Sequence, residues 1–200
     1  KFEGEYLNGE RNGKGKEYYA NGKLKFEGEY LKGNRANGKV KEYFYDGQLI
    51  YEGDYINGKR NGKGKEFYNG KLEFEGEYLN GKRWIGKEKE YYRNGELKFE
   101  GENLNGKKNG KGKEYYDDGK LIFKGEYLNG KRWDGEGFNK YGNIEFIIKN
   151  GNGKGKEYCY NGDLEFEGEY LNGKKWNGKV KEYYINSKLK FEGEYLNGER

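Results

Sequence analysis

Residues 166–173 read Phe-Glu-Gly-Glu-Tyr-Leu-Asn-Gly, and variants of this phrase recur along the chain. Each copy begins with an aromatic residue, and successive copies start 20 to 25 residues apart, at Phe2, Phe26, Tyr51, Phe74, Phe99, Phe123, Phe146, Phe166 and Phe191. A period in this range indicates a repeat protein, in which each unit packs only against its neighbours. We therefore predict a single repeat array over residues 1–200. Because Lys1 lies inside a repeat and the chain has no Met, we expect a fragment of a longer protein.

The composition favours an ordered chain without a thick core. The sequence has 40 basic and 35 acidic residues, a formal charge of +5 and a mean hydropathy of -1.40. Disordered chains are poor in aromatic residues, whereas this one has 22 Tyr, 11 Phe and 3 Trp. The single Cys excludes an intrachain disulfide and fits a reducing compartment. We expect a cytoplasmic location, with the inner membrane surface and the cytoskeleton as candidate places.

Asn-Gly and Asp-Gly pairs predict hairpins between the phrases. Such pairs tolerate the positive φ angles of two-residue type I′ turns, and alternating apolar and charged residues around them are typical of strands. The pairs are Asn21-Gly22, Asp46-Gly47, Asn69-Gly70, Asn94-Gly95, Asp118-Gly119 and Asn161-Gly162. A longer turn is expected after each Tyr-Leu. The prediction is an all-β fold, an elongated single-layer antiparallel meander of about eight hairpins.

A turn at Asn21-Gly22 fixes which residues face each other. The predicted partners are Tyr19 with Leu24, Glu17 with Phe26, Gly15 with Gly28, Lys16 with Glu27, and Lys14 with Glu29. This register gathers the aromatic residues on one face and pairs unlike charges on the other. The hairpin at Asn69-Gly70 is one residue short, so we expect a bulge or a shifted turn there. Residues 136–152 break the pattern and predict a kink or, alternatively, a boundary between two subarrays.

The phrase Tyr51-Glu-Gly-Asp-Tyr-Ile-Asn-Gly-Lys-Arg-Asn-Gly-Lys-Gly64 resembles a MORN (membrane occupation and recognition nexus) repeat, and the resemblance covers essentially the whole chain. Residues 89–97, Lys-Glu-Tyr-Tyr-Arg-Asn-Gly-Glu-Leu, are similar to a MORN variant found in bacterial antitoxin-like proteins. The resemblance implies an elongated sheet of hairpins that often self-associates. It also implies scaffold or protein-binding roles, with phosphoinositide binding proposed for some members.

The aromatic face is one candidate interaction surface. It consists of Phe26, Tyr30, Tyr51, Tyr55, Phe74, Tyr78, Phe99, Phe123, Tyr127, Phe166, Tyr170, Phe191 and Tyr195. One hypothesis is that a protein partner or a second copy of the chain docks on these rings. The alternative is a thin core in which the rings hold the repeats together. Trp84, Trp133 and Trp176 occupy equivalent positions and are interpreted as structural.

Basic pairs in the longer turns are a second candidate surface. They are Lys59-Arg60, Lys82-Arg83, Lys107-Lys108, Lys131-Arg132 and Lys174-Lys175. The repeat places them equivalently, so we expect them along one edge of the sheet. A row of cations there would suit anionic phospholipid or phosphoinositide headgroups. The alternative is that these lysines keep the protein soluble and deter strand addition.

Catalytic constellations are missing from the sequence. The chain has no His and no Thr, and its one Ser is Ser187, so a Ser-His or Cys-His pair is excluded. Cys159 takes a position where other repeats carry Tyr and is interpreted as a packing residue. We expect no cofactor, metal, nucleic acid or small-molecule substrate. The leading hypothesis is a non-catalytic scaffold that binds proteins or itself; the alternatives are a peripheral membrane module and a toxin inhibitor.

Overall fold

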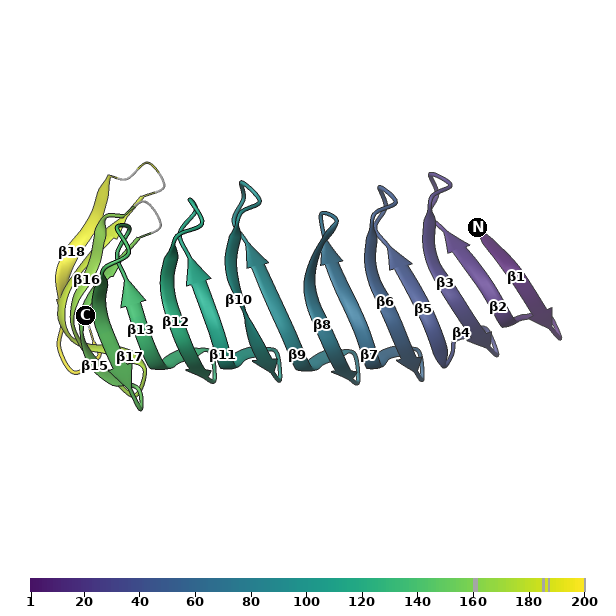
Figure 1. The fold of residues 1–200 in the computed structure, drawn as a ribbon. Helices are drawn as coiled ribbons and strands as arrows, with labels where there is room; N and C mark the ends of the chain where they lie inside the picture. Colours follow the sequence, from purple (N-terminus) through teal and green to yellow (C-terminus); the bar gives the residue numbers. More distant parts are fainter. Residues whose placement is uncertain (160–161, 185, 187, 200) are drawn as a thin grey trace. The chain divides into compact units, whose positions relative to one another are not determined.

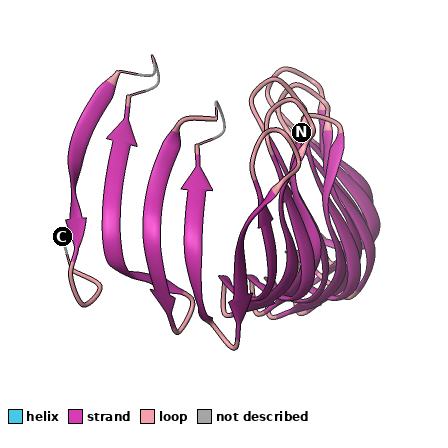
Figure 2. Cartoon of the chain, turned by 60° about the vertical axis from the view of Figure 1, so that its left-hand side comes forward, coloured by secondary structure: helices cyan, strands magenta, loops and turns pink. Residues whose placement is uncertain are grey.

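The computed structural model describes residues 1–159, 162–184, 186 and 188–199. These described residues contain eighteen β-strands and no helix. They divide into two compact units, Lys1–Glu88 with Asn103–Gly106, and Lys89–Glu102 with Lys107–Arg200. Each unit is an open single layer of antiparallel strands joined by short loops (Figures 1 and 2). The prediction of an all-β antiparallel meander is therefore confirmed, while a single array over 1–200 stays a prediction.

The first unit contains strands β1 to β8, residues 82–88 of β9 and the end of β10. Their bounds are β1 Phe2–Leu7, β2 Glu10–Tyr18, β3 Leu24–Leu31, β4 Asn34–Arg35, β5 Gly38–Tyr43, β6 Leu49–Ile56, β7 Lys59–Tyr68, β8 Lys71–Leu79 and β9 Lys82–Tyr91. The short β4 and the following β5 together take the place of one long strand beside β3.

The second unit contains residues 89–91 of β9, residues 97–102 of β10 and strands β11 to β18. Their bounds are β10 Leu97–Leu104, β11 Lys107–Tyr115, β12 Leu121–Leu128, β13 Lys131–Phe138, β14 Ile144–Lys149, β15 Asn152–Tyr158, β16 Leu164–Leu171, β17 Lys174–Tyr183 and β18 Leu189–Tyr195. From β11 onward each strand pairs antiparallel with the next one in sequence.

The tight turns lie at the opposite end of the strands from the one predicted. The two-residue turns follow Tyr-Leu, as at Asn8-Gly9, where φ is 51° and 80° and Leu7 pairs with Glu10. At Asn21-Gly22 only the glycine has positive φ, 81°, and the Tyr19 N–H donates to the Lys23 carbonyl at 2.9 Å. That bond closes a three-residue loop ending in a left-handed glycine, a common hairpin alternative. The predicted type I′ turn at Asn21-Gly22 is therefore wrong.

The other predicted turns follow the same rule with one exception. Three-residue loops also form at Asp46-Gly47, Asn94-Gly95 and Asp118-Gly119, while Asn161 of the Asn161-Gly162 pair lies outside the described residues. At Asn69-Gly70 both residues have positive φ, 48° and 73°, so this loop is a two-residue turn. A register shift between Glu66 and Phe67 confirms the bulge expected for that hairpin.

The predicted register holds through the middle of the strands and fails beside the loops. Glu17 pairs with Phe26, Lys16 with Glu27 and Lys14 with Glu29, as predicted, but Leu24 pairs with Tyr18 rather than Tyr19 because a register shift follows Glu17. The Lys16 amine lies 3.3 Å from the Glu27 carboxylate. The β2–β3 hairpin therefore has an aromatic face and an opposite face of paired charges. In the second unit Lys113 instead pairs with Lys124, and Glu136 pairs with Ile147.

Neighbouring hairpins are joined by hydrogen bonds at their two-residue turns as well as by strand pairing. The Gly81 N–H donates to the Arg60 carbonyl at 2.8 Å, and the Asn80 N–H donates to Asn61 Oδ1 at 3.1 Å. Equivalent bonds recur from Asn129 to Asn109 and from Asn172 to Asn152. They satisfy turn groups that would otherwise face water and hold each turn against the preceding hairpin.

The irregular residues 136–152 form a shortened hairpin in the second unit. β13 ends at Phe138 and β14 begins at Ile144. Phe146 is stacked on Phe123 at 14° and on Tyr170 at 26°, whereas most ring pairs in the regular repeats meet edge to face, as Phe74 and Tyr78 do at 85°. The sequence irregularity thus coincides with a change in ring packing.

Candidate functional site

The rings of the aromatic face are already covered by their own chain. Eleven of the thirteen predicted residues are buried, among them Phe26, Tyr51 and Phe74 at 0% exposure. Of the remaining two, Phe191 is 39% exposed and Tyr195 is partly buried. The rings therefore form the thin core of each unit, the alternative considered from the sequence, and offer little free area to a docking partner.

Glycine makes this thin core possible because it lets a ring lie flat on the sheet. Gly53 and Gly64 pair across β6 and β7, and the Tyr51 ring lies over both of them. A Cβ on Gly64 would come within 2.5 Å of the Tyr51 hydroxyl oxygen and 2.7 Å of its ring. Any larger residue at this position would push the ring off the sheet.

The structure separates the two members of each predicted basic pair. The second members, Arg60, Arg83, Lys108, Arg132 and Lys175, lie over aromatic rings of the repeat. The first members, Lys59, Lys82, Lys107, Lys131 and Lys174, stand at the two-residue turns, and all but Lys131 are exposed. Only the first members are placed to meet a lipid surface or a partner, and that role stays a prediction.

In the first unit the half-buried arginines Arg60 and Arg83 alternate with glutamates in a ladder above the rings. Arg60 bonds Glu42 through Nε at 3.0 Å and Nη2 at 3.1 Å, and Glu66 through Nη1 at 3.2 Å. Arg83 continues to Glu66 at 2.7 Å and to Glu88 at 2.9 Å. The Arg60 guanidinium lies 4.2 Å from the centre of the Tyr51 ring. This ladder covers the core with charge-assisted bonds.

The second unit carries a ladder of the same kind. Arg132 bonds the carboxylates of Glu114 and Glu157, and Lys175 lies 3.1 Å from Glu157. Lys108 lies 3.9 Å from the Phe99 ring centre and 3.3 Å from the Glu90 carboxylate. The glutamates of both ladders, among them Glu42, Glu66, Glu114 and Glu157, lie on the aromatic face. The sequence did not predict that they would bind the second members of the basic pairs.

The ladder lowers the pKa of Glu66 and Glu114 although both carboxyl groups are half-buried. Burial alone raises the pKa of the Glu66 carboxyl, but hydrogen bonding and charge from Arg83, with Arg60, outweigh it, so the net pKa is lowered. The pKa of Glu114 is likewise lowered because Arg132 outweighs burial. The Tyr55 hydroxyl, which donates to Glu42 at 2.6 Å, has its pKa raised to about 12 by burial and by that carboxylate. These groups are matched to one another, which indicates a structural role.

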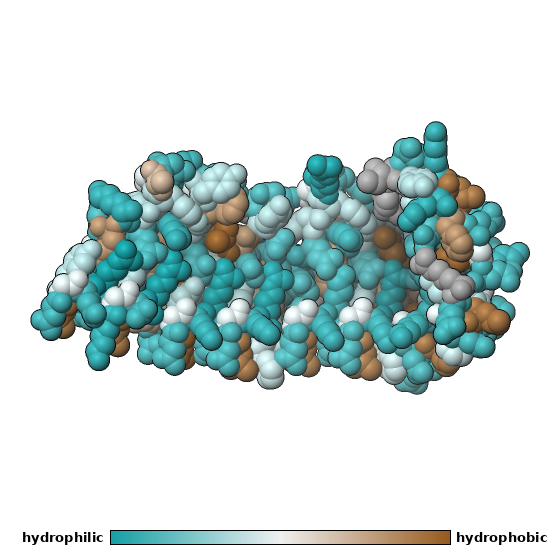
Figure 3. Space-filling model, turned by 180° about the vertical axis from the view of Figure 1, so that it is seen from behind, coloured by the Kyte–Doolittle hydropathy of each residue, from teal (hydrophilic) through white to brown (hydrophobic). Residues whose placement is uncertain are grey.

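Exposed aliphatic side chains recur at equivalent positions in each unit, a feature that was not predicted from the sequence. In the first unit Leu7, Leu31, Ile56 and Leu79 are 46–59% exposed; in the second, Leu128 and Leu171 are 39% and 37% exposed. We call this set the aliphatic ridge. It lies at the two-residue turns, where hydrophobic atoms gather along the lower edge in Figure 3. The signal was present in the sequence, since these residues follow the last Tyr of each phrase and so point to the charged side.

Four of the ridge residues each face a first-member lysine across the turn. Ile56 pairs with Lys59, Leu79 with Lys82, Leu128 with Lys131 and Leu171 with Lys174. Each of these hairpin ends therefore presents an aliphatic side chain beside an amine. This combination suits apolar contact with a partner whose surroundings are acidic.

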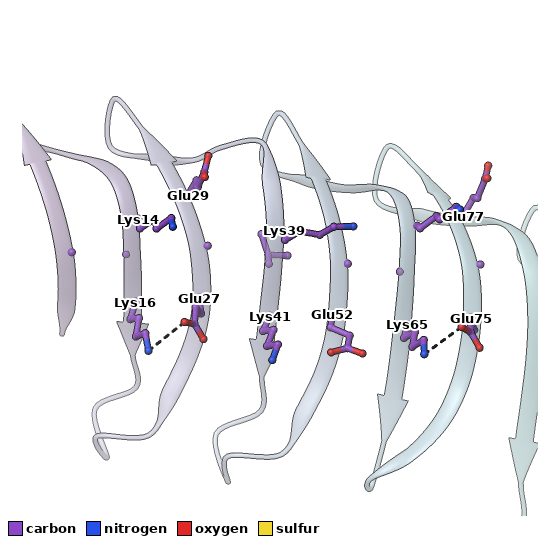
Figure 4. A pocket seen from close by; sticks show the side chains of 18 of the residues that line it. Lys14, Lys16, Glu27, Glu29, Lys39, Lys41, Glu52, Lys65, Glu75 and Glu77 are labelled. Atoms are coloured by element: carbon purple, nitrogen blue, oxygen red, sulfur yellow. Dashed lines mark ion pairs between the residues drawn. The ribbon is translucent and has the colours of Figure 1, made fainter.

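The face opposite the rings is a groove between two rows of alternating charge in the first unit. Lys16, Glu27, Lys41, Glu52, Lys65 and Glu75 form one row, and Figure 4 shows the second row above it. Glycine backbone forms the floor between them. No single sign dominates either row, so the groove does not suit a uniformly charged polymer.

The chemistry of the described residues gives no support to catalysis. No group of three or more His, Cys, Asp or Glu side chains is placed to hold a metal in the described part of the chain. Cys159 is free and partly buried, and burial with nearby carboxylates raises the pKa of its thiol to about 11, opposite to a reactive nucleophile. The described residues contain no helix that is long and apolar enough to cross a membrane.

Comparison with known families explains the periodicity. The MORN repeat model matches residues 2–23, 51–71 and 150–164. The MORN repeat variant model matches residues 36–57, 85–102, 108–129 and 176–197. Comparison with curated proteins gives no match. Since the family models together cover more than half of a chain folded as stacked hairpins, this protein belongs to the MORN repeat family.

Proposed function

We propose that this chain is a non-catalytic interaction scaffold that contacts protein partners through the aliphatic ridge. MORN repeats are generally protein- or membrane-interaction modules and generally non-enzymatic. The observation that carries the proposal is the contrast in exposure between the rings, mostly at 0–6%, and the first-unit ridge residues Leu7, Leu31, Ile56 and Leu79, at 46–59%. Isolated exposed aliphatics are ordinary, but a repeated row of them marks a contact surface.

The energy available from the ridge fits a moderate, multivalent contact. Burying a fully exposed Leu or Ile side chain contributes about 2 kcal/mol, so covering these half-exposed side chains contributes about 1 kcal/mol each. The repeat displays them at regular intervals, so a partner that engages several at once gains affinity from effective concentration. Self-association through the rings or sheet ends, and inhibition of a cognate toxin, stay predictions that the ridge does not specifically favour.

A second candidate is peripheral binding to an anionic membrane surface, and the lysines facing the ridge favour it. A lysine close to an anionic bilayer contributes about 1 kcal/mol, and an adjacent aliphatic side chain can enter the interface. This candidate uses Lys59, Lys82, Lys131 and Lys174 and leaves Arg60 and Arg83 in the ladder. A location at the inner membrane surface would follow from it.

One triple variant tests both candidates. Leu31→Glu, Ile56→Glu and Leu79→Glu together should abolish retention of a binding partner and leave the strand circular dichroism unchanged. The matched control is Glu27→Gln with Glu52→Gln and Glu75→Gln, which alters the same face away from the ridge and should retain the partner. Co-sedimentation with phosphatidylserine vesicles, compared with neutral vesicles, distinguishes a membrane from a protein. Unchanged binding by the triple variant in both assays would refute the ridge as the contact surface.

A further inference from the structure

The regular pattern of side chains on the aromatic face is interrupted in the second unit at the shortened hairpin β13–β14. β13 ends at Phe138 directly after Gly137, whereas β17 continues past the equivalent Val180 through Lys181, Glu182 and Tyr183. The hairpin thereby loses a ladder glutamate, and Arg132 instead bonds Glu157 of the next hairpin. The missing residues remove side-chain volume from the aromatic face above Phe138 and Phe146.

A second change removes more volume at the same place. In regular repeats the residue that opens the three-residue loop is aromatic and reaches the next hairpin. Tyr19 donates to the Tyr43 carbonyl at 2.9 Å, Tyr92 to the Tyr115 carbonyl at 2.6 Å and Tyr116 to the Phe138 carbonyl at 2.9 Å. Tyr116 is 1% exposed, so its ring fills the space over the next hairpin.

The next two loops open with small residues instead. Asn139 N–H donates to the Asn143 carbonyl and Cys159 N–H donates to the Asp163 carbonyl, the bond that Tyr116 makes with Lys120. Asn139 and Cys159 therefore hold the loop-opening position without an aromatic ring. By the repeat, a ring at these two positions would reach toward the carbonyls of Tyr158 and Tyr183.

The result is a hollow of about 490 Å³ on the aromatic face of the second unit. Its aromatic and apolar lining comes from Tyr92, Tyr115, Ile122, Phe138, Phe146, Tyr158, Cys159 and Tyr183, and the other eight lining residues are charged. Its volume lies in the range of small-ligand sites, and its rings lie among charged side chains that make up half of the lining. Seven of the eight charged lining side chains are paired with an opposite charge: Arg132 with Glu114 and Glu157, Lys108 with Glu90, Glu165 with Lys175, and Lys190 with Glu182. They therefore do not call for a charged ligand.

We propose that this hollow receives a tyrosine side chain presented by a partner polypeptide, as the aromatic anchor of a protein contact. The inference rests on the proposed interaction function and assigns it a second, specific contact. The repeat itself defines the occupant, because a chain tyrosine fills the equivalent space at Tyr92 and Tyr116. Buried aromatic anchors in preformed pockets dominate many protein interfaces. An incoming phenol would donate to a backbone carbonyl, as Tyr116 does, and pack its ring against Phe138 and Phe146.

The repeat also supplies a variant that fills one of the two ring-free positions of the hollow and keeps the residue type of the regular loops. Cys159→Tyr restores the residue type of the regular loops, so its ring should occupy the space over Tyr183. Cys159→Ala is the matched control, since it removes the thiol and leaves the hollow open. The fold of both variants is checked by circular dichroism.

The probes are p-cresol, which is the tyrosine side chain alone, and the peptides acetyl-Gly-Tyr-Gly-amide and acetyl-Gly-Leu-Gly-amide, titrated in NMR experiments on the full chain. We expect p-cresol and the tyrosine peptide to shift the amide signals of Phe138, Tyr158 and Tyr183 in the millimolar range that suits so small a ligand. The affinity should fall at least tenfold in Cys159→Tyr and change less than twofold in Cys159→Ala. Absence of these shifts, equal binding of the leucine peptide, or equal binding by Cys159→Tyr would overturn the proposal.

These outcomes are separable from those of the ridge experiment. The Cys159→Tyr variant leaves the aliphatic ridge intact. If a partner is retained through the ridge but the wild type does not bind p-cresol, the tyrosine anchor alone is refuted. Conversely, specific p-cresol binding together with a ridge variant that retains every partner refutes the proposed contact surface and supports the hollow.

Discussion

Replacing Arg60 with alanine should destabilise the protein far more than replacing its neighbour Lys59. Arg60 makes three charge-assisted bonds with Glu42 and Glu66, and the three side chains are 16–26% exposed. Removing one partner of a largely buried ion pair costs about 3–5 kcal/mol because the remaining charge is left without compensation. Glu66 keeps Arg83 at 2.7 Å, so the lower end of this range, about 3 kcal/mol, is expected. Lys59 is exposed and its alanine variant should stay within about 0.5 kcal/mol.

The assay is urea unfolding of the full chain followed by circular dichroism, with hydrogen exchange of the β6 and β7 amides as the local readout. The pKa of Glu66 is lowered in the folded protein, so its contribution to the free energy of unfolding is complete above about pH 5 and lost as the pH falls through the folded pKa. The penalty of Arg60→Ala should therefore shrink as the pH falls through the folded pKa of Glu66. Equal destabilisation by the Arg60 and Lys59 variants, or a penalty independent of pH, would refute the ladder as the cover of the core.

Three further predictions concern the ladder, the glycines and the turns. In the second unit the charge and hydrogen bonds of Arg132 outweigh burial and lower the pKa of Glu114, and the charges of Arg132 and Lys175 do the same for Glu157. The urea midpoint of the wild type should therefore fall below about pH 5, and Arg132→Leu should lose much of that pH dependence. Gly64→Ala should cost about 1–3 kcal/mol in urea unfolding because its Cβ would lie 2.5 Å from the Tyr51 hydroxyl; an effect below about 0.5 kcal/mol would mean the ring moves freely. Asn80→Ala should cost about 1–2 kcal/mol because φ at this turn is 52°, whereas Asn80→Gly should be close to neutral in the same thermal or urea assay.

The strands and their register could be predicted from the sequence because both follow from side-chain alternation. Glu17 opposite Phe26 and Lys16 opposite Glu27 satisfy the ring and charge patterns together, and a shift by one residue would exchange the two faces. The turns could not be placed as well, because an Asn-Gly pair fits both a type I′ turn and the last two residues of a three-residue loop. Asn8-Gly9 and Asn21-Gly22 have the same letters, and only the glycine of the second pair is left-handed.

The candidate site was harder to predict because exposure depends on which side chains lie above one another. Lys59 and Arg60 are adjacent in the sequence and look like one basic pair, but strand alternation sends Arg60 to the ring side, where Glu42 and Glu66 bind it. For the same reason the rings appeared open to a partner, although the ladder covers them. The hollow near Cys159 follows from two missing rings, and it becomes visible only when the loops are aligned by their hydrogen bonds.

The charged face should behave as continuous rows rather than as separate ion pairs. Glu27 pairs with Lys16 on one side and Lys41 on the other, and Glu52 pairs with Lys41 and Lys65. Exchanging Lys41→Glu with Glu52→Lys keeps that pair attractive but places like charges beside Glu27 and Lys65. Each like-charge neighbour costs roughly 0.2–1 kcal/mol, so the double variant should be about 1 kcal/mol less stable in urea, with the loss reduced at high salt. An isolated pair would instead tolerate the exchange, and wild-type stability of the double variant would show that the rows act pair by pair.

Because signs alternate at the strand spacing, the electrostatic field of the rows falls off within about one strand spacing of the surface. Long-range electrostatic attraction is therefore weak on this face, and the contact proposed for the ridge would depend on short-range packing.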